Sequence, residues 1–178
     1  MWNSNIMFSI PFWKTHTNNF KEKKKEILKV LKKYPEEPVE YHTFKTNRQG
    51  KNTYLLSDEF LKIFHEEINL LAGTLKKNFQ MKKVWSVSYK TNEYHPYHHH
   101  GDKGLSGILY LNLKKDMPHT VFVSPMPDWR EGRNTYFNLP VKEGDMMVVP
   151  SYLAHFTPPN LSKEEKRVIA FDIDEIEI

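Results

Sequence analysis

The chain has no cysteine among its 178 residues, which excludes two classes of site. Neither a disulfide framework nor a thiolate metal site is possible, so any metal must be bound by imidazole nitrogen and by oxygen. No apolar run approaches the ~20 residues that a membrane-spanning helix needs. The segment Met1 to Phe8 also lacks the basic start and long apolar core of a signal peptide. We therefore expect a cytoplasmic protein without a membrane partner.

Neither sign of charge dominates the sequence. Lysine and arginine number 26 against 22 acidic residues, and the surplus comes largely from one amphipathic segment, Lys21 to Lys33. A net charge of +4 is too small and too local to indicate nucleic-acid binding by itself. With 39% hydrophobic and 13% aromatic residues, the chain can bury a real core. Its length predicts a single domain over residues 1–178.

Two amphipathic helices are predicted in the N-terminal part, after a short apolar edge strand at Ile6 to Trp13. The first begins at Thr17 or Asn18 and ends before a loop that we predict from Pro35 to Lys51. The second begins at Ser57, and its apolar residues recur at steps of three and four. These apolar residues are Leu61, Phe64, Ile68, Leu71 and Leu75.

From Lys82 onward the apolar residues alternate with polar ones, which indicates β-strands. Further strands are predicted at Leu105 to Leu113, Thr120 to Ser124, Thr135 to Leu139, Asp145 to Pro150 and Arg167 to Ile173. Because no helical pattern separates them, we expect a mainly β fold, an antiparallel sandwich or barrel with flanking helices. The N-terminal strand and helices would then occupy residues 1–80 and the barrel core residues 82–178.

A cluster of histidines lies directly before the first long strand-like segment after residue 100. Four of the nine histidines fall within six residues, from His95 to His100. In an extended chain alternate side chains share a face, so His98 and His100 can bind one ion together. His155 lies between two later strands, and in a barrel it can return to the early cluster. This pattern is typical of a metal site at the mouth of a β-barrel; unrelated surface histidines are the alternative.

Two further side chains are candidates for the same cavity. Arg167 opens the last predicted strand with Ile169 and Phe171 on its own face. A cation among apolar residues needs an anionic partner, because a buried unpaired charge costs several kcal/mol. Tyr110 shares a face with Ile108 and could project inward. The other interpretations are that Arg167 lies in water at the strand entrance and that Tyr110 is a core residue.

The order and spacing of these segments resemble the small iron(II)- and 2-oxoglutarate-dependent oxygenases of phages and marine bacteria, which are related to prolyl hydroxylases. The resemblance rests on His98-x-His100, Leu105 to Leu111, Glu143-Gly144-Asp145, Pro150-Ser151, His155 and Arg167. It extends to the apolar N-terminal segment and so covers nearly the whole chain. It implies a double-stranded β-helix, a jelly-roll or cupin-like barrel, buttressed by two N-terminal helices.

The resemblance also implies an activity and its cosubstrates. The protein would bind Fe(II), 2-oxoglutarate and O2, and would couple the oxidative decarboxylation of 2-oxoglutarate to succinate with hydroxylation of a substrate. Arg167 would pair with the distal carboxylate of 2-oxoglutarate, and Tyr110 would add a hydrogen bond. Ile169 stands where the family commonly has a serine, which places one cosubstrate contact in question.

The set of metal ligands stays open at this point. The usual triad of such enzymes is two histidines and a carboxylate. Aligned without a gap, the ligands of this chain are His98, His100 and His155. Read as the prolyl-hydroxylase pattern Tyr-x-x-His-x-Asp, they are His100, Asp102 and His155.

Two other functions fit parts of the pattern. A three-histidine cupin-type metal dioxygenase would use the same imidazoles but would leave Arg167 without a partner. A non-catalytic metal-binding barrel module is the second. The substrate of the leading hypothesis is a protein, a nucleic acid or a small molecule. The long loop Met126 to Arg133 carries Trp129 and two arginines, so we expect it to line the substrate entrance, with ordinary hairpin decoration as the alternative.

Overall fold

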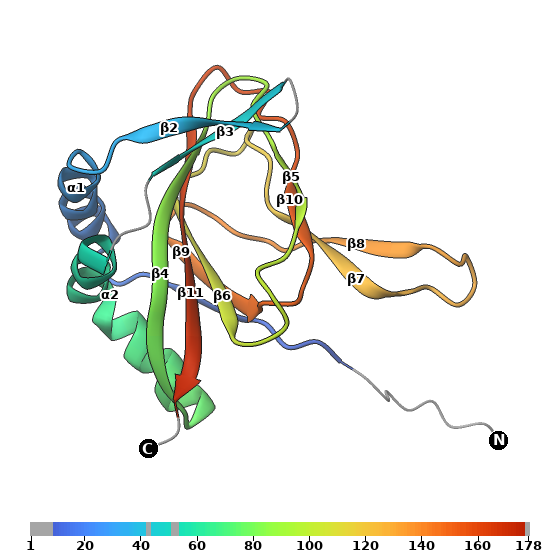
Figure 1. Cartoon of the computed structure of the whole chain (residues 1–178), viewed down its shortest axis with the longest axis horizontal. Helices are drawn as coiled ribbons and strands as arrows, with labels where there is room; N and C mark the ends of the chain where they lie inside the picture. The colour runs from blue at the N-terminus through green and yellow to red at the C-terminus, as the bar shows by residue number, and fades with distance from the viewer. Residues whose placement is uncertain (1–8, 42–43, 51–53, 177–178) are drawn as a thin grey trace.

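The structure is a computed structural model that describes residues 9–41, 44–50 and 54–176. Within these residues the chain forms two helices and eleven strands (Figure 1). The helices are α1 (Phe20–Leu31) and α2 (Tyr54–Leu75). The strands are β1 (Trp13–His16), β2 (Glu36–Tyr41), β3 (Phe44–Gly50), β4 (Asn78–Tyr89), β5 (His95–His98), β6 (Leu105–Asn112), β7 (Val121–Pro127), β8 (Asn134–Asn138), β9 (Asp145–Pro150), β10 (His155–Thr157) and β11 (Lys166–Ile176). None of the described helices has the length and apolar character needed to cross a membrane.

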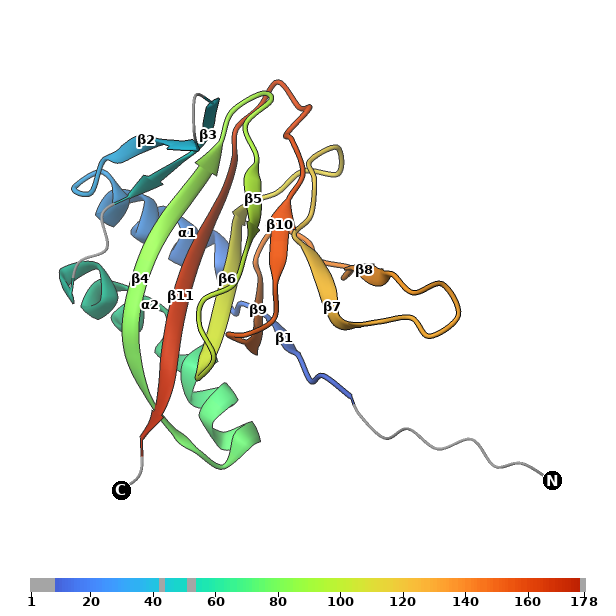
Figure 2. The same ribbon diagram turned by 45° about the vertical axis from the view of Figure 1, so that its right-hand side comes forward.

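The strands form two antiparallel sheets. The large sheet has the order β1-β9-β6-β11-β4-β3-β2, and the small sheet has the order β5-β10-β7-β8. Helices α1 and α2 cover one face of the large sheet, and the small sheet lies on the other side (Figures 1 and 2). The predicted jelly-roll fold with two flanking helices is therefore confirmed. The barrel is not closed, however, because no strand among the described residues belongs to both sheets.

Two apolar clusters lie on the two faces of the large sheet. On the helix side, Phe171 of β11 packs against Phe60 of α2, with their ring centroids 5.2 Å apart. Between the sheets, Val168 of β11 belongs to a cluster that also contains Phe122 of the small sheet. Alternate side chains of a strand point to opposite faces. Odd-numbered residues of β11 therefore point toward the helices, and even-numbered residues point into the space between the sheets.

Both predicted helices are present, and the predicted loop between them is wrong. The segment Pro35 to Lys51 instead contains the hairpin of β2 and β3. β3 joins the large sheet by pairing Arg48 with Ser88 and Gln49 with Val87 of β4. Its residues are mostly polar, so the alternation that identifies a half-buried strand is missing, and pairing with β4 decides the conformation.

The predicted edge strand Ile6 to Trp13 is displaced along the chain. β1 begins where that range ends and pairs with β9 at the edge of the large sheet, with Trp13 opposite Val148. The edge position is confirmed, while residues 6–8 of the predicted range lie outside the described residues. Pro11 has no N–H for a sheet ladder, which is consistent with a strand that starts after it.

Gly107 offers a test of how β6 packs against β11. It pairs with Phe171, and a Cβ at position 107 would lie 2.0 Å from that ring. We expect Gly107→Ala to lower the free energy of unfolding by about 1–3 kcal/mol, because the ring would have to move within a packed cluster. Gly73→Ala in α2, where a Cβ would meet nothing within 4 Å, should leave stability unchanged or raise it by up to ~1 kcal/mol. Urea unfolding measures both, and equal losses would contradict the packing described.

Candidate functional site

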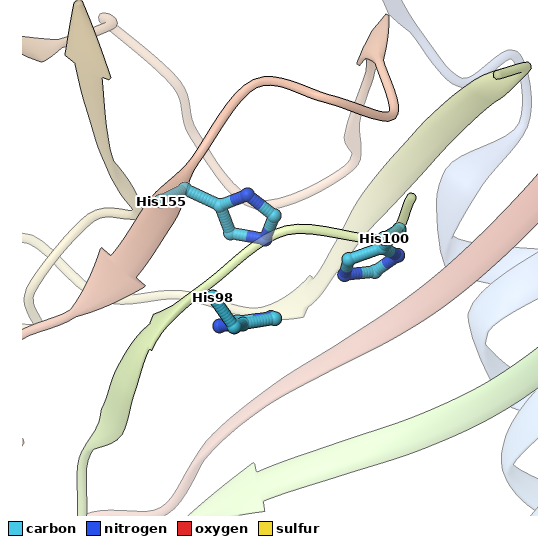
Figure 3. Close-up of side chains that lie close together, drawn as sticks. All are labelled: His98, His100 and His155. Atoms are coloured by element: carbon cyan, nitrogen blue, oxygen red, sulfur yellow. The ribbon is translucent and has the colours of Figure 1, made fainter. Parts of the chain in front are cut away.

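Three histidine side chains converge between the two sheets. His98 ends β5, His100 follows it, and His155 begins β10 directly opposite His98 in the strand pairing. One ligand nitrogen from each residue lies within 4.8 Å of the other two (Figure 3). The structure thus brings together the three histidines that the ungapped alignment selects.

Each of the three rings is held by a hydrogen bond from Nδ1. His98 and His155 each donate to the backbone carbonyl two residues earlier, at 2.8 Å and 3.0 Å. His100 donates to the carboxylate of Asp172 at 2.7 Å. Because a carbonyl or carboxylate oxygen can only accept, Nδ1 carries the proton in every ring. The Nε2 lone pairs are therefore free to bind a metal.

Burial keeps the imidazoles of His98 and His155 neutral. His155 is 6% exposed, and burial together with the neighbouring His98 lowers the pKa of His155 to about 3. Burial also lowers the pKa of His98. His95, whose ring stacks on His98 with centroids 4.2 Å apart, has its pKa lowered to about 2, first by burial and then by the adjacent imidazoles. A neutral imidazole is the form that binds a metal, so the fold supplies these nitrogens in the required state.

Asp172 of β11 is anchored from both neighbouring strands. Ser106 of β6 donates to its Oδ1 at 2.7 Å, and Lys83 of β4 lies 3.1 Å from its Oδ2. Burial opposes ionisation of this carboxyl group, but the hydrogen bonds from His100, Ser106 and Lys83 hold its pKa below the ordinary value. A charged carboxylate therefore lies directly behind the ring of His100.

Asp102 does not take part in this cluster. It lies in an exposed bend after Gly101, whose φ of 117° turns the chain away. The ligand atoms that converge come from histidines alone among the described residues. The geometry therefore favours His98, His100 and His155 over the reading in which Asp102 replaces one imidazole.

The structure places Arg167 away from the three histidines. The prediction that it shares a face with Ile169 and Phe171 holds, but that face of β11 packs toward the helices. Its guanidinium pairs with Glu36 at 3.4 Å and with Glu165 at 2.7 Å. Arg167 therefore lies on the side of the large sheet opposite to the histidines, and its charge is already paired with two carboxylates. It is not available to a molecule bound beside the histidines.

Lys166, one position earlier, points into the space between the sheets. Its side chain is fully buried, and its Nζ has no hydrogen-bond partner among the described residues. The ammonium lies 5.0 Å from the centre of the Tyr89 ring. Burial lowers the pKa of Lys166 to about 7. Because a buried cation without an anion is costly, Lys166 is a candidate residue for binding a negatively charged ligand.

A row of polar side chains joins Lys166 to the histidines. The Tyr89 hydroxyl, on the ring that Lys166 covers, is hydrogen-bonded to Nδ1 of His95 at 3.2 Å. His95 in turn stacks on His98. The unpaired ammonium and the three imidazoles therefore belong to one interior region.

Tyr110 also points into this region and shares its face of β6 with Ile108, as expected from the sequence. It lies on β6 opposite Val168 of β11 and is fully buried. Its hydroxyl is beside Thr120 but makes no hydrogen bond of standard geometry. Burial raises the pKa of Tyr110 to about 12, so the hydroxyl keeps its proton and can donate.

The histidines are reached through an open pocket of about 470 Å³. It is lined by Gln49, Gly50, Lys83, Trp85, His95, His98, His99 and His100. None of these residues belongs to Met126 to Arg133, the segment expected to line the substrate entrance. That segment forms the outer end of the β7–β8 hairpin of the small sheet, which projects away from the large sheet (Figure 1). Met126 instead lines a separate apolar cleft of about 360 Å³.

Sequence reasoning missed three residues of this region, namely Lys166, Asp172 and His95. Lys166 and Asp172 share the even-numbered face of β11 with Val168. The alternation of side chains along β11 places these two residues on one face. Both faces of this strand also carry apolar residues, however, so the sequence does not tell which face is the inner one.

Several solved structures share this fold. The 2-oxoglutarate-dependent epimerase SnoN from nogalamycin biosynthesis superposes with a TM-score of 0.73 at 13% identity, covering 93% of this chain and 78% of its own. HygX from Streptomyces hygroscopicus, solved with nickel and 2-oxoglutarate, gives 0.66 at 13% identity, covering 93% and 83%. A prolyl-4-hydroxylase from Pseudomonas putida gives 0.62 at 12% identity, covering 95% of both chains. At these identities the similarity concerns the fold.

The sequence itself decides the family. No curated protein sequence matches the chain. A family model described as "Putative 2OG-Fe(II) oxygenase" matches residues 83–172, just over half of the chain. This range begins in β4 and ends in β11, so it contains all three converging histidines together with Asp172. The protein belongs to the 2-oxoglutarate- and iron(II)-dependent oxygenase family.

Proposed function

We propose that the protein is an iron(II)- and 2-oxoglutarate-dependent hydroxylase whose metal ligands are the Nε2 atoms of His98, His100 and His155. One observation carries the proposal: all three Nδ1 atoms are engaged as donors, while the three ligand nitrogens lie within 4.8 Å of one another. The reaction would be the oxidative decarboxylation of 2-oxoglutarate to succinate, coupled to hydroxylation of a substrate.

The donor set suits a divalent iron ion. Imidazole nitrogen binds first-row transition metals well, and three ligands leave further coordination positions open. The ordinary triad contains a carboxylate, and in this chain the third imidazole takes its place. When bound, the iron supplies the activation of dioxygen together with the keto acid. The residues of the chain hold the ion, orient the cosubstrate and keep the interior apolar.

Lys166, in place of Arg167, would bind the distal carboxylate of 2-oxoglutarate. Its ammonium is buried and unpaired in the same interior region as the histidines. An arriving carboxylate would favour the charged form of this amine and form a charge-assisted hydrogen bond with it. The free hydroxyl of Tyr110 would add a second hydrogen bond.

A keto-acid cosubstrate explains more of the site than either alternative does. A three-histidine dioxygenase without 2-oxoglutarate, or a non-catalytic metal-binding module, would leave the Lys166 ammonium buried without an anion. In the proposed enzyme the substrate, which is a protein, a nucleic acid or a small molecule, would enter through the open pocket beside Trp85 and His99.

Succinate formation tests the proposal. Wild-type protein should release succinate from 2-oxoglutarate in a reaction that requires added Fe(II) and O2. His98→Ala and His155→Ala should each abolish this reaction, because two imidazoles hold the ion weakly. His65→Ala, which removes an exposed histidine from α2, is the matched control and should retain full activity. Metal-independent succinate release, or full activity of His155→Ala, would contradict the proposal.

Binding of 2-oxoglutarate distinguishes the two neighbouring cations. Calorimetry on the nickel-loaded protein without O2 should show Lys166→Met weakening 2-oxoglutarate binding by about 10- to 100-fold, the equivalent of losing one charged hydrogen bond. Arg167→Met should leave the dissociation constant unchanged, because Arg167 lies on the other face of β11. If Arg167→Met weakened 2-oxoglutarate binding and Lys166→Met did not, Arg167 would be the residue that binds the distal carboxylate.

The same lysine should destabilise the protein when no ligand is bound. Its pKa is about 7 in the folded protein and 10.5 when unfolded, so the unfolded chain binds more protons between these values and stability rises with pH there. Lys166→Met should therefore raise the free energy of unfolding by about 1–3 kcal/mol at pH 6, with a smaller gain at pH 9. Lys90→Met, at an exposed position, is the control in urea unfolding. A lower free energy of unfolding for Lys166→Met than for wild-type protein at pH 6 would contradict the claim that the Lys166 ammonium is buried without a partner.

A further inference from the structure

The three histidines are not held in the same way. His98 and His155 both donate to neutral backbone carbonyls two residues earlier in the chain. His100 donates to a charged side chain, Asp172, at 2.7 Å. Among the described residues, Asp172 is also the only carboxylate with a hydrogen bond to one of the three rings. One imidazole of the site is therefore different in its electrostatics from the other two.

The carboxylate of Asp172 has little freedom to move. Ser106 donates to the same Oδ1 that His100 reaches, and Ser106 is itself hydrogen-bonded to Ser151 at 2.9 Å. In the strand register Asp172 lies opposite Ser106 of β6 and opposite Lys83 of β4. The side chain is 6% exposed. This anchoring fixes the distance and direction of the hydrogen bond to His100.

Two other groups face this pair. The Trp85 ring lies 5.4 Å from the ring of His100, which limits rotation of the imidazole. The Lys83 ammonium lies 3.1 Å from Oδ2 of Asp172 and 5.2 Å from the centre of the Trp85 ring. Because the Lys83 side chain is 39% exposed, water screens its charge, while the contact between the buried side chains of Asp172 and His100 is shielded from water.

These contacts place a negative charge next to a triad that lacks one. A triad of two histidines and a carboxylate gives its metal one anionic ligand, whereas three neutral imidazoles give none. A carboxylate that accepts a hydrogen bond from Nδ1–H of an imidazole raises the basicity of Nε2 in that imidazole. The same hydrogen bond fixes the tautomer and the orientation of the ring. Asp172 is in the position to supply both effects through His100.

We propose that Asp172 is a positioning residue that replaces, through His100, the anionic ligand which this triad lacks. It holds the His100 ring with Nε2 toward the metal and makes this imidazole the strongest electron donor of the three. The inference rests on the metal site proposed above. A purely structural role, in which Asp172 only joins β11 to its neighbours, predicts different behaviour in the test below.

Cobalt(II) binding to the metal-free protein provides the test. Asp172→Asn keeps the volume of the side chain and an oxygen that can accept from His100, but it removes the charge. Its dissociation constant for Co(II), measured by competition with a chelator, should rise by about 10- to 100-fold. The visible absorption spectrum of bound Co(II) should also shift, because a less basic imidazole changes the ligand field. A purely structural role would not move that spectrum.

The chain contains a matched control for this variant. Asp145 is also buried and accepts from Nδ1 of a histidine, His16, at 2.8 Å, but it lies where β9 meets β1. Asp145→Asn should leave both the dissociation constant and the spectrum of Co(II) unchanged. If Asp172→Asn and Asp145→Asn weakened Co(II) binding equally, the loss would reflect general destabilisation of the fold. This result would overturn the inference.

The outcomes separate this inference from the metal site itself. Wild-type protein that binds no Co(II) would refute the proposed metal site and with it the inference. Wild-type and Asp172→Asn proteins that bind Co(II) with equal affinity and the same spectrum would refute only the role of Asp172. Should Asp172→Asn fail to fold, Ser106→Ala removes one anchor of the carboxylate, and a Co(II) affinity loss below about tenfold is then expected. No loss in Ser106→Ala would overturn the inference.

Discussion

The site depends on one strand pairing, which sets His155 of β10 opposite His98 of β5. Both strands are short, and each has a histidine at the end where the two meet. A shift of the register by one residue would turn one imidazole to the outer face of the small sheet. The carbonyl contacts of the two Nδ1 atoms add the second constraint, because they fix which nitrogen remains free. From these two conditions follows a preformed set of three nitrogens, which we propose as the metal ligands.

The last strand of the chain, β11, provides the charged groups next to the three histidines. Its inner face carries Lys166 at one end and Asp172 further along, and its outer face packs on the helices. A cation without a partner and an anion hydrogen-bonded to His100 are therefore held by the same backbone. We interpret this face as the part of the fold that adapts a three-imidazole site to an anionic cosubstrate, with Lys166 binding the ligand and Asp172 acting on the metal.

Much of this arrangement could be predicted from the sequence. The change from helical to alternating periodicity at Lys82, and the order of the motifs, predicted the jelly roll with its two flanking helices. The i, i+2 spacing of His98 and His100 predicted that they share a face. The polar hairpin of β2 and β3 could not be found in this way, because its strands are specified by pairing with β4 and carry little apolar alternation.

The side of the sheet on which Arg167 lies could not be predicted from the sequence, for a definite physical reason. Periodicity tells which residues of a strand share a face, and that prediction was correct for Arg167 and Phe171. It does not tell which face is the inner one when helices cover the other, since both faces are then apolar. Only the packing of Phe171 on α2 decides this, and it makes Lys166 the inward cation. Hydrogen-bond partners such as Asp172 for His100, 72 positions apart, are likewise set by the tertiary fold.

A crystal structure of the Fe(II)–2-oxoglutarate complex, prepared without O2, tests the central claim most directly. The account predicts iron bonded to Nε2 of His98, His100 and His155 at about 2.0–2.2 Å, as for imidazole ligands of similar divalent ions. The distal carboxylate of 2-oxoglutarate should contact Nζ of Lys166. Iron bound by Asp102, or a cosubstrate carboxylate paired with Arg167, would contradict it.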